Sequence, residues 1–413
     1  MKTPAYLKDY SSSELLKTFN AVNTEFAALQ IQKLKPAEKM ERYNHFDFSP
    51  STRQQLLKVF GTEKPFKLQA LSRADGKVDL EFALDPLDYR DDVIGATVKW
   101  APMNGLSTFD KTFRHAEVSA FMPWVKFEHQ DGWNLIMDKL NLQGTQHLNV
   151  HDLWLGKVEF NVASVNVQDV SAANLAAINN IKLNVEMSQH GKMADVTYAV
   201  SSQSAKFGDT ELGPMRFAFR LNNLSEQGFA AMQKSLRNVV TSGMPEKEQD
   251  KAVLALITKD GKKVLTTATS LDIEEISVVY HDFKAAIHGK LWLDHAKPGD
   301  MLSFDKWKNK LALHVDVEMP MGFAEEVARF FSRRSLQQKL ESGQTVSEDA
   351  VNQSADVMVT QTVENLRAQK MIRVDNGMLR SSLDYSAGKF RVNGNPINMN
   401  LPKFNAGDAK TGK

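Results

Sequence analysis

The chain has 413 residues, a formal net charge of +1, 42% hydrophobic and 24% charged residues, and no cysteine. These ordinary values exclude wholesale disorder and a collagen-like chain. The balanced charge argues against nucleic-acid binding, and the lack of cysteine excludes a disulfide framework, thiol catalysis and cysteine-based metal sites. At about 100–200 residues per domain, the length predicts two or three domains, or one long repetitive one.

The first sixty residues predict helices. Leu15, Phe19, Val22 and Phe26 recur at helical spacing, and a second apolar cluster surrounds Leu56. The chain does not open with a basic segment followed by an apolar one, and no stretch approaches the ~20 apolar residues that span a bilayer. We therefore expect a helical N-terminal segment over 1–62, in a protein that is either cytoplasmic as made or lacks its native N-terminus here.

From Pro65 onward the hydrophobic period changes to two. Val78, Leu80, Phe82 and Leu84 alternate with polar residues, which places the two sets on opposite faces of a strand. This pattern is typical of antiparallel sheets with one solvated face, whereas parallel sheets contain continuous apolar runs. The same alternation returns in 158–162, 181–187, 215–221, 285–293, 311–319 and 389–392.

Four dipeptides tolerate positive φ and predict tight hairpins: Asp75-Gly76, Asp131-Gly132, Asp260-Gly261 and Asn376-Gly377. The last one joins two alternating segments and is followed by a second turn, so it predicts a three-strand meander over 371–393.

Helical patterns cover 225–240, 248–257, 322–340 and 345–367. Asn223 with Glu226, and Thr345 with Glu348, have the spacing of capping boxes. The helices at 225–240 and 322–340 both follow a long alternating strand and both begin near Gly-Phe-Ala, which suggests a duplicated strand–helix module.

These elements predict a β-rich α+β fold with long antiparallel meander sheets, an elongated body and three or four packed helices. We expect a β-rich module with a terminal helix over 63–240, a second β-rich module with helices over 241–400, and a flexible tail over 401–413.

The residues offer little catalytic chemistry. His147 and His151 lie in an alternating segment, where residues four apart are about 13 Å apart, too far for one zinc ion. His281, Asp282 and His288 could join a distant serine in a hydrolase site, but no Gly-x-Ser-x-Gly elbow nominates that serine. No phosphate loop or dinucleotide fingerprint is present, so we predict no catalytic residues, no cofactor and no metal.

Two tryptophans are candidates for a binding surface. Trp292 falls on the face opposite Leu291 and Leu293, and Trp124 lies in another strand-like segment. An exposed aromatic face marks a ligand or partner surface, whereas a second layer packed on that face would give the pattern no functional meaning.

The succession of strands and turns resembles the YdgA-like family, a domain-of-unknown-function family of Gram-negative envelope proteins. The resemblance covers about 60–400, and residues that carry it include 64–66, 84–89, 155–158, 212–224, 310–320 and 375–396. It implies a periplasmic body anchored at the inner membrane by an N-terminal segment that this chain lacks, and it transfers no catalytic residues.

We therefore expect a non-enzymatic envelope protein that binds an amphiphile or lipid, or an envelope protein partner, along a sheet surface or helix-covered groove. Two alternatives stay open: a hydrolase with a non-sequential site, and an adhesin or assembly subunit that uses open sheet edges.

Overall fold

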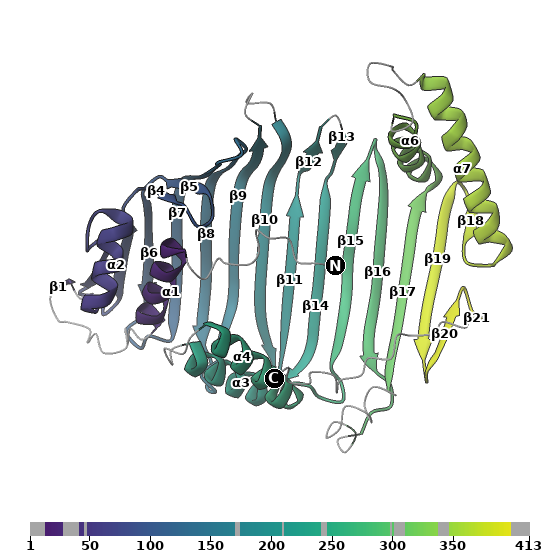
Figure 1. Ribbon diagram of the computed structural model, residues 1–413. Helices are drawn as coiled ribbons and strands as arrows, with labels where there is room; N and C mark the ends of the chain where they lie inside the picture. The colour runs from purple at the N-terminus through teal and green to yellow at the C-terminus, as the bar shows by residue number, and fades with distance from the viewer. Residues whose placement is uncertain are drawn as a thin grey trace, which may run out of the picture. The chain divides into compact units, whose positions relative to one another are not determined.

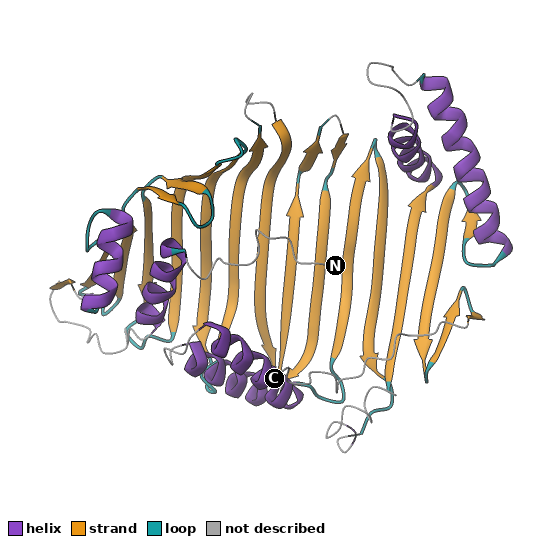
Figure 2. Cartoon of the chain, in the orientation of Figure 1, coloured by secondary structure: helices purple, strands orange, loops and turns teal. Residues whose placement is uncertain are grey.

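The computed structural model divides into two compact units, Met1–Asp282 (unit 1) and Phe283–Lys413 (unit 2). Long antiparallel strands dominate both units, and six helices accompany them in the described residues, which confirms the predicted β-rich α+β class (Figures 1 and 2). The structure describes residues 13–27, 41–44, 48–169, 174–208, 210–240, 246–297, 300, 310–337 and 347–397. The predicted tail therefore lies outside the described residues.

The main sheet of unit 1 follows chain order closely, because most neighbouring strands are hairpins. Its pairing order is β1–β2–β3–β6–β7–β8–β9–β10–β11–β14–β15. The bounds of these strands are β1 Glu41–Asn44, β2 Phe66–Ser72, β3 Val78–Leu84, β6 Met103–Phe109, β7 His115–His129, β8 Asn134–Leu148, β9 Trp154–Gln168, β10 Asn174–His190, β11 Met193–Ser202, β14 Met215–Ser225 and β15 Ser270–Tyr280.

Four short strands lie beside the long ones. The hairpin of β4 (Leu87–Asp91) and β5 (Ala96–Trp100) pairs through β5 with β7. The hairpin of β12 (Ser204–Phe207) and β13 (Thr210–Leu212) pairs through β12 with β10. Strand β1 falls within the segment predicted to be helical, which is a correction: it pairs with β2, a partner that local sequence does not reveal.

Helices α1 (Glu14–Ala27) and α2 (Pro50–Phe60) lie within the segment predicted to be helical. Ser49 caps α2 by accepting a hydrogen bond from the Thr52 backbone N–H, and Gly61 ends the helix with φ of 69°. Leu15 of α1 and Val59 of α2 join one buried cluster with residues of the sheet, Leu84, Leu87, Val98 and Trp100.

Helices α3 (Glu226–Val240) and α4 (Glu246–Val264) connect β14 to β15. The predicted capping by Asn223 is wrong. The Ser225 hydroxyl accepts from the Gly228 N–H at 3.2 Å, whereas Asn223 has φ of 57° and donates to the Ala268 carbonyl. The hairpin predicted at Asp260-Gly261 is also wrong, because these residues lie inside α4, where the Asp260 carboxylate pairs with Lys263 one turn later.

The four longest strands share an irregularity that we call the crease: Pro123, Lys139, Ala163 and Asn180. The ladders between β7, β8, β9 and β10 skip these residues, and Lys139 and Asn180 both have φ of 50°. A one-residue slip turns the side chains of a strand to its other face. Each strand's apolar set also shifts by one position at the crease, so that its apolar residues stay on one face.

Unit 2 has the strand order β16–β17–β19–β20–β21, with β18 also paired to β19. Asn376 and Gly377 have φ of 48° and 73° in the turn between β18 and β19, so the predicted meander is confirmed. The strand bounds are β16 Phe283–Leu293, β17 Leu311–Pro320, β18 Arg373–Asp375, β19 Met378–Ser386, β20 Lys389–Val392 and β21 Asn395–Ile397.

Helices α6 (Met321–Gln337) and α7 (Glu348–Ala368) follow β17. Ser347 is the N-cap residue of α7 and makes no side-chain capping bond, while Thr345 lies outside the described residues. Each unit thus contains one antiparallel strand pair joined through two helices: β14–α3–α4–β15 in unit 1, and β17–α6–α7–β19 in unit 2, with β18 before β19. In the part of the chain that the structure describes, no helix has the length and apolar character needed to cross a bilayer.

The predicted division between 240 and 241 falls inside unit 1, between α3 and α4. These two helices pack against each other, and the strands that they connect, β14 and β15, are paired neighbours. The two compact units meet along the chain after Asp282, at the turn that follows β15.

Candidate functional site

Unit 1 presents an apolar face, because paired residues on neighbouring strands point to the same side. Two rows of paired residues cross seven strands, β7 to β11, β14 and β15. At about 4.8 Å between strands, each row is roughly 29 Å long. The apolar rows are Ala120, Leu142, Phe160, Leu183, Val200, Phe217 and Ile276, and, beside them, Val118, Gly144, Val158, Val185, Tyr198, Phe219 and Ile273.

The apolar rows are not sealed as a protein core is. No member of either row is buried, and Tyr198 and Phe217 are each 43% exposed although they face the apolar side. The buried clusters of unit 1 lie nearer its margins, around Trp100 under α1 and α2, and around Ala194 under α3. The middle of the face therefore keeps apolar surface available for contact.

The opposite face of the same strands is polar and charged. Lys157 pairs with Glu159 at 2.7 Å, and this hydrogen bond raises the pKa of the lysine. Further along the sheet, Arg220 pairs with Glu274 at 2.7 Å, and Arg216 pairs with a neighbouring glutamate. Because these charged pairs lie on one face and the apolar rows on the other, the two sides of the sheet differ in polarity.

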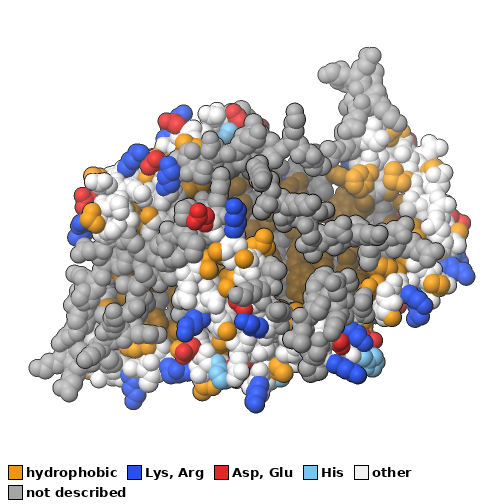
Figure 3. Space-filling view, turned by 60° about the horizontal axis from the view of Figure 1, so that its bottom comes forward, with side chains coloured by type: hydrophobic (Ala, Val, Ile, Leu, Met, Phe, Trp, Pro, Cys, Tyr) orange, Lys and Arg blue, Asp and Glu red, His pale blue; other side chains and the backbone are white. Residues whose placement is uncertain are grey.

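Helices border the apolar face along two of its margins. Leu15 of α1 and Val59 of α2 cover the β4–β5 end, while Phe229 and Ala230 of α3 pack on the buried cluster of Leu153, Leu155 and Ala194 near the ends of the long strands. Figure 1 shows both helix pairs on the same side of the unit 1 sheet. Figure 3 shows hydrophobic side chains gathered near the middle of the view, and most of the charged side chains nearer its outline.

A groove of about 960 Å³, which we call the end groove, lies between α1, the β4–β5 turn and β7. Two of its wall residues, Val125 and Phe127, pair with Met137 and Leu135 on β8. These apolar pairs lie across the crease from the apolar rows, so the end groove and the rows occupy the same face. The groove is lined by Leu15, Leu16, Phe19, Asp92, Val93, Ile94, Gly95, Ala96, Val98, Trp100, Val125, Phe127, His129, Gln130, Asp131 and Trp133.

Polar groups stand at one part of this groove. The His129 ring stacks on Trp133 with centroids 4.9 Å apart, and its Nδ1 lies 3.3 Å from the Asp131 carboxylate. The remaining wall is dominated by aliphatic and aromatic side chains. An apolar groove with a few polar groups at one place is the usual form of a site for an amphiphilic ligand.

A buried carboxylate anchors α3 to the sheet. Glu226 is 2% exposed and accepts hydrogen bonds from the Asn149 and Gln189 side-chain amides, the second at 2.9 Å. His151 lies 3.9 Å from the same carboxylate, which is beyond hydrogen-bond distance. The cluster satisfies a buried charge with neighbouring donors, so its evident effect is structural.

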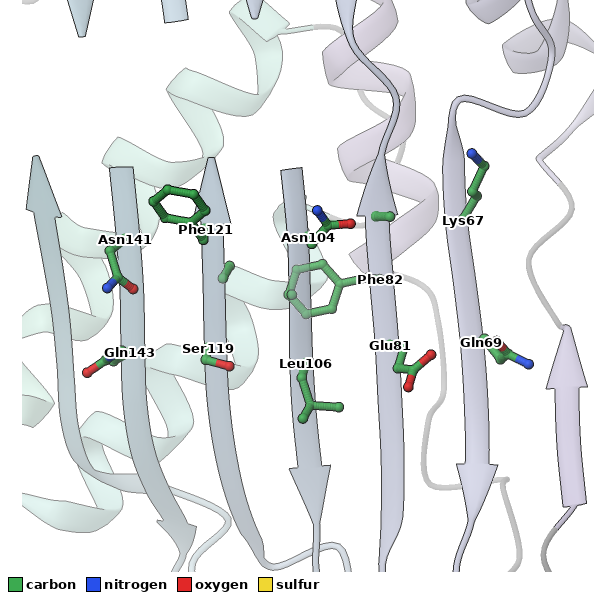
Figure 4. Close-up of a pocket in the computed structure, with 13 residues that line it drawn as sticks. Lys67, Gln69, Glu81, Phe82, Asn104, Leu106, Ser119, Phe121, Asn141 and Gln143 are labelled. Carbon is green, nitrogen blue, oxygen red and sulfur yellow. The ribbon is translucent and has the colours of Figure 1, made fainter. Parts of the chain in front are cut away.

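A second hollow, of about 660 Å³, lies on the polar face over β2, β3 and β6 to β8 (Figure 4). Side-chain amides of Asn104 and Asn141 flank Phe121, which is 45% exposed. Gly105 admits the Phe82 ring, because a Cβ at this glycine would lie 2.1 Å from a ring carbon. The hollow is wide and open, and seven of its thirteen lining residues are polar or charged, which distinguishes it from the end groove.

The two histidines considered as a metal pair, His147 and His151, lie on different elements. His147 lies on β8, whereas His151 lies in the turn after the strand ends at Leu148, which corrects the expected strand over 146–151. No group of three or more histidine, aspartate or glutamate side chains suited to a metal ion occurs among the described residues.

The candidate hydrolase residues occupy a turn and a strand. His281 and Asp282, with φ of 43° and 67°, form the turn after β15, and the His281 ring stacks on Tyr280 with centroids 4.2 Å apart. His288 lies on the polar side of β16, paired with Asp316 of β17. The hydrolase alternative that names these three residues stays untested.

The two candidate tryptophans each lie on a polar face, in different units. Trp124 is 38% exposed and borders the crease on β7, on the side opposite Val125. Trp292 is half-buried and pairs with Ala312, which is 1% exposed, on the side of β16 opposite Leu291. Neither side chain lines the end groove, and a ligand at either one stays a prediction.

Sequence reasoning missed the aromatic wall of the end groove. Trp100 and Phe19 contact each other with ring centroids 5.7 Å apart, although they are far apart in the chain. The alternation of Ala96, Val98 and Trp100 was a usable signal for a strand with a buried face. Nothing local indicated that α1 would meet it.

Comparison with protein-family models identifies the family of this chain. A family model described as a bacterial protein of unknown function, DUF945, matches residues 45–400. No curated protein and no solved structure matches the chain. The family model covers most of the sequence, including the strands of both apolar rows and of unit 2. The chain therefore belongs to the DUF945 family of bacterial proteins of unknown function.

Proposed function

We propose that this protein is a non-enzymatic component of the bacterial cell envelope that binds the acyl chains of an amphiphile on the apolar face of unit 1. One observation carries the proposal: the apolar rows stay unburied across seven paired strands, with Tyr198 and Phe217 each 43% exposed. Contiguous exposed apolar surface of this kind marks a site of contact with a lipid, a ligand or a partner.

The dimensions favour an acyl chain as the occupant. The rows are roughly 29 Å long at the usual strand spacing, whereas an acyl chain spans about 15 Å, half of the ~30 Å hydrocarbon core of a bilayer. A chain laid along a row would therefore be contacted over its full length. Each buried methylene contributes about 0.8 kcal/mol, so a chain of ordinary length gains enough to bind tightly.

The polar groups of the end groove offer a place for a headgroup. His129, Gln130 and Asp131 lie beside the apolar wall formed by Phe127 and Trp133. A ligand with one polar end and a long apolar part fits this distribution, while a wholly polar ligand leaves the wall uncovered. In this proposal the chain of the amphiphile lies over the sheet and its polar end lies near the β7–β8 turn.

The cellular location rests on the resemblance to the YdgA-like family, which has a periplasmic body anchored at the inner membrane. We infer the same location for this chain. A periplasmic protein with an acyl-binding face has amphiphiles available from both membranes that enclose the compartment.

Paired substitutions on adjacent residues test the proposal. Leu183 lies in an apolar row, and Asn184, the next residue of β10, points to the polar face. Leu183→Asp buries a carboxylate under the ligand, so we expect binding of a fluorescent phospholipid from vesicles to weaken at least about tenfold. Asn184→Asp adds the same charge on the other face and is expected to leave binding unchanged. Circular dichroism and thermal unfolding are the controls for folding of both variants.

The absence of cysteine permits a direct readout of the face involved. Phe217→Cys and Arg216→Cys each introduce a single thiol, on the apolar and the polar face respectively. With an environment-sensitive dye attached, phospholipid vesicles should shift the emission of the Phe217 position to shorter wavelength and leave the Arg216 position unchanged. Equal responses from both positions, or no response from either, would refute binding on the apolar face.

A further inference from the structure

Unit 2 contains a separate apolar cavity of about 280 Å³ between α6, α7 and the strands β17 and β19. We call it the unit 2 cavity. It is lined by Val317, Met319, Phe323, Ala324, Val327, Ala328, Phe331, Met358, Val359, Thr362, Val363, Leu366, Ile372, Leu379, Arg380 and Ser381.

The cavity arises because the packing of α7 changes along its length. In the first half of the helix, Val351 is 0% exposed and Ala355 is 1% exposed. Beyond these, Val359 and Val363 are only partly buried, and Met358 is 40% exposed. The helix is therefore closed against its neighbours at one end and open over the cavity at the other.

The walls cannot hold water well. The Ser381 hydroxyl already donates to the Met371 carbonyl at 2.8 Å, and the Arg380 guanidinium pairs with Glu318 and Asp375. Most of the remaining lining is aliphatic or aromatic carbon. A buried water needs two to four polar partners, and hollows without them stay dry or take up an apolar ligand.

We propose that the unit 2 cavity binds a single aliphatic chain of the fatty-acid type, about a dozen carbons long. A dry cavity of about 150 Å³ accommodates one benzene ring of six carbons, so about 280 Å³ corresponds to roughly eleven carbons. A docked helix does not fit, since two turns of a helix about 10 Å across occupy several times this volume.

This site lies in a different unit from the apolar rows and does not depend on the function proposed for them. It also differs in capacity, because a cavity of about 280 Å³ holds only a short chain whereas the apolar rows extend over seven strands. A short free fatty acid is therefore the ligand that separates the two sites.

Dodecanoate binding to the full chain tests the proposal, measured by isothermal titration calorimetry. Val363→Trp fills the cavity and should weaken binding at least about tenfold, the effect of losing roughly two buried methylenes. Val357, on the same helix, is 51% exposed and does not line the cavity, so Val357→Trp is the matched control and should bind as the unchanged protein does. Equal binding by both variants, or no binding by the unchanged protein, would overturn the proposal.

A second measurement covers the case in which Val363→Trp fails to fold. Thr362 is exposed and lines the cavity, so Thr362→Cys accepts a fluorophore in an otherwise cysteine-free chain. Dodecanoate brominated near its end should quench this fluorophore in a saturable way, and unbrominated dodecanoate should compete. Quenching that rises linearly without saturation would instead indicate random collision and would count against a site. Phospholipid binding by the Leu183→Asp variant tests the sheet proposal separately, so either proposal can fail alone.

Discussion

The two helix pairs leave and rejoin their sheets through equivalent connections, but they pack differently. In unit 1, Gly228 brings α3 so close to the end of α4 that a Cβ would lie 2.0 Å from the Lys263 carbonyl oxygen. In unit 2, the equivalent Gly322 at the start of α6 faces the Phe283 ring, and α6 and α7 leave a cavity of about 280 Å³.

The difference shows what closes a helix pair onto a sheet. Unit 1 uses a glycine at the point of closest approach and a buried carboxylate, Glu226, held by the amides of Asn149 and Gln189. At the corresponding start of α6, Gly322 lies against the ring of Phe283, and this side chain is itself 38% exposed. Close approach and satisfied polar anchors fix the first pair, whereas apolar contact alone leaves space in the second.

The largest expected effect comes from adding one methyl group at the tight contact. Gly228→Ala forces α3 away from a backbone carbonyl, and overpacking of this kind costs about 3 kcal/mol. Gly322→Ala needs only a partly exposed ring to move, so we expect a cost below about 1 kcal/mol. Urea unfolding of the full chain measures both. Equal losses would show that the two glycines are equally confined.

Removal of the buried anchor should have the next largest effect. Glu226→Ala removes the buried carboxylate that accepts from the Asn149 and Gln189 amides, and the loss of these two hydrogen bonds costs about 2 kcal/mol, while Glu226→Gln retains one acceptor oxygen and should cost less. Hydrogen–deuterium exchange of peptides from α3 reports the loss locally. Protection that falls in unit 2 but not in α3 would contradict a local anchoring role.

Larger side chains should have opposite effects in the two regions. Val359→Phe fills part of the unit 2 cavity with a larger side chain. We expect it to stabilise the protein by about 1 kcal/mol, as cavity-filling substitutions do. Leu224 of β14 is 0% exposed, so Leu224→Phe overfills its site and should destabilise by about 1–3 kcal/mol. Thermal unfolding distinguishes the two signs. A loss of stability in Val359→Phe would show that the cavity walls cannot move apart.

The smallest expected effect is a contrast in pH dependence. Hydrogen bonds to Asp384 and Asp316 raise the pKa of His314 above 6.5, so its stabilising effect is present below that pH and is lost as pH rises through the raised pKa. In unit 1, hydrogen bonds from Lys126 and Lys99 lower the pKa of Glu128 below 4.5. The stabilising contribution of the ionised Glu128 is therefore present above that pH and is lost as pH falls through the lowered pKa.

Hydrogen–deuterium exchange of peptides from the two strands, measured from acid to mildly alkaline pH, checks this contrast. As pH rises, protection should fall in β17, which contains His314, and rise in β7, which contains Glu128. His314→Gln should flatten the response of β17 and leave β7 as it was. Because the His314 side chain is 42% exposed, the change should be a modest one.

Elements fixed by short-range chemistry were predicted from the sequence, and elements fixed by distant partners were not. Asn376-Gly377 needs only positive φ and two flanking strands, and its hairpin was predicted correctly. Asp260-Gly261 has the same local character, but α4 continues through it. The capping prediction at Asn223 was wrong because Ser225 offers the closer hydroxyl and Asn223 bonds elsewhere.

The candidate site was predicted only in outline. Alternation within 158–162 and 181–187 correctly indicated one apolar face, but a strictly alternating pattern cannot continue through the crease. The end groove depends on the contact of α1 with Trp100, and the unit 2 cavity depends on how two helices settle on a sheet. Both follow from tertiary packing, for which a single sequence gives no spacing rule.

The crease also limits how these four strands can diverge. Deleting Lys139 alone would turn one half of β8 over, exposing Leu135 and Met137 to the charged side while the neighbouring strands kept their orientation. A tolerated deletion would need a matching change in each adjoining strand. The four strands must therefore keep their lengths together. Within the segment from β7 to β10, we expect insertions and deletions among family members to fall in the turns and not inside the strands.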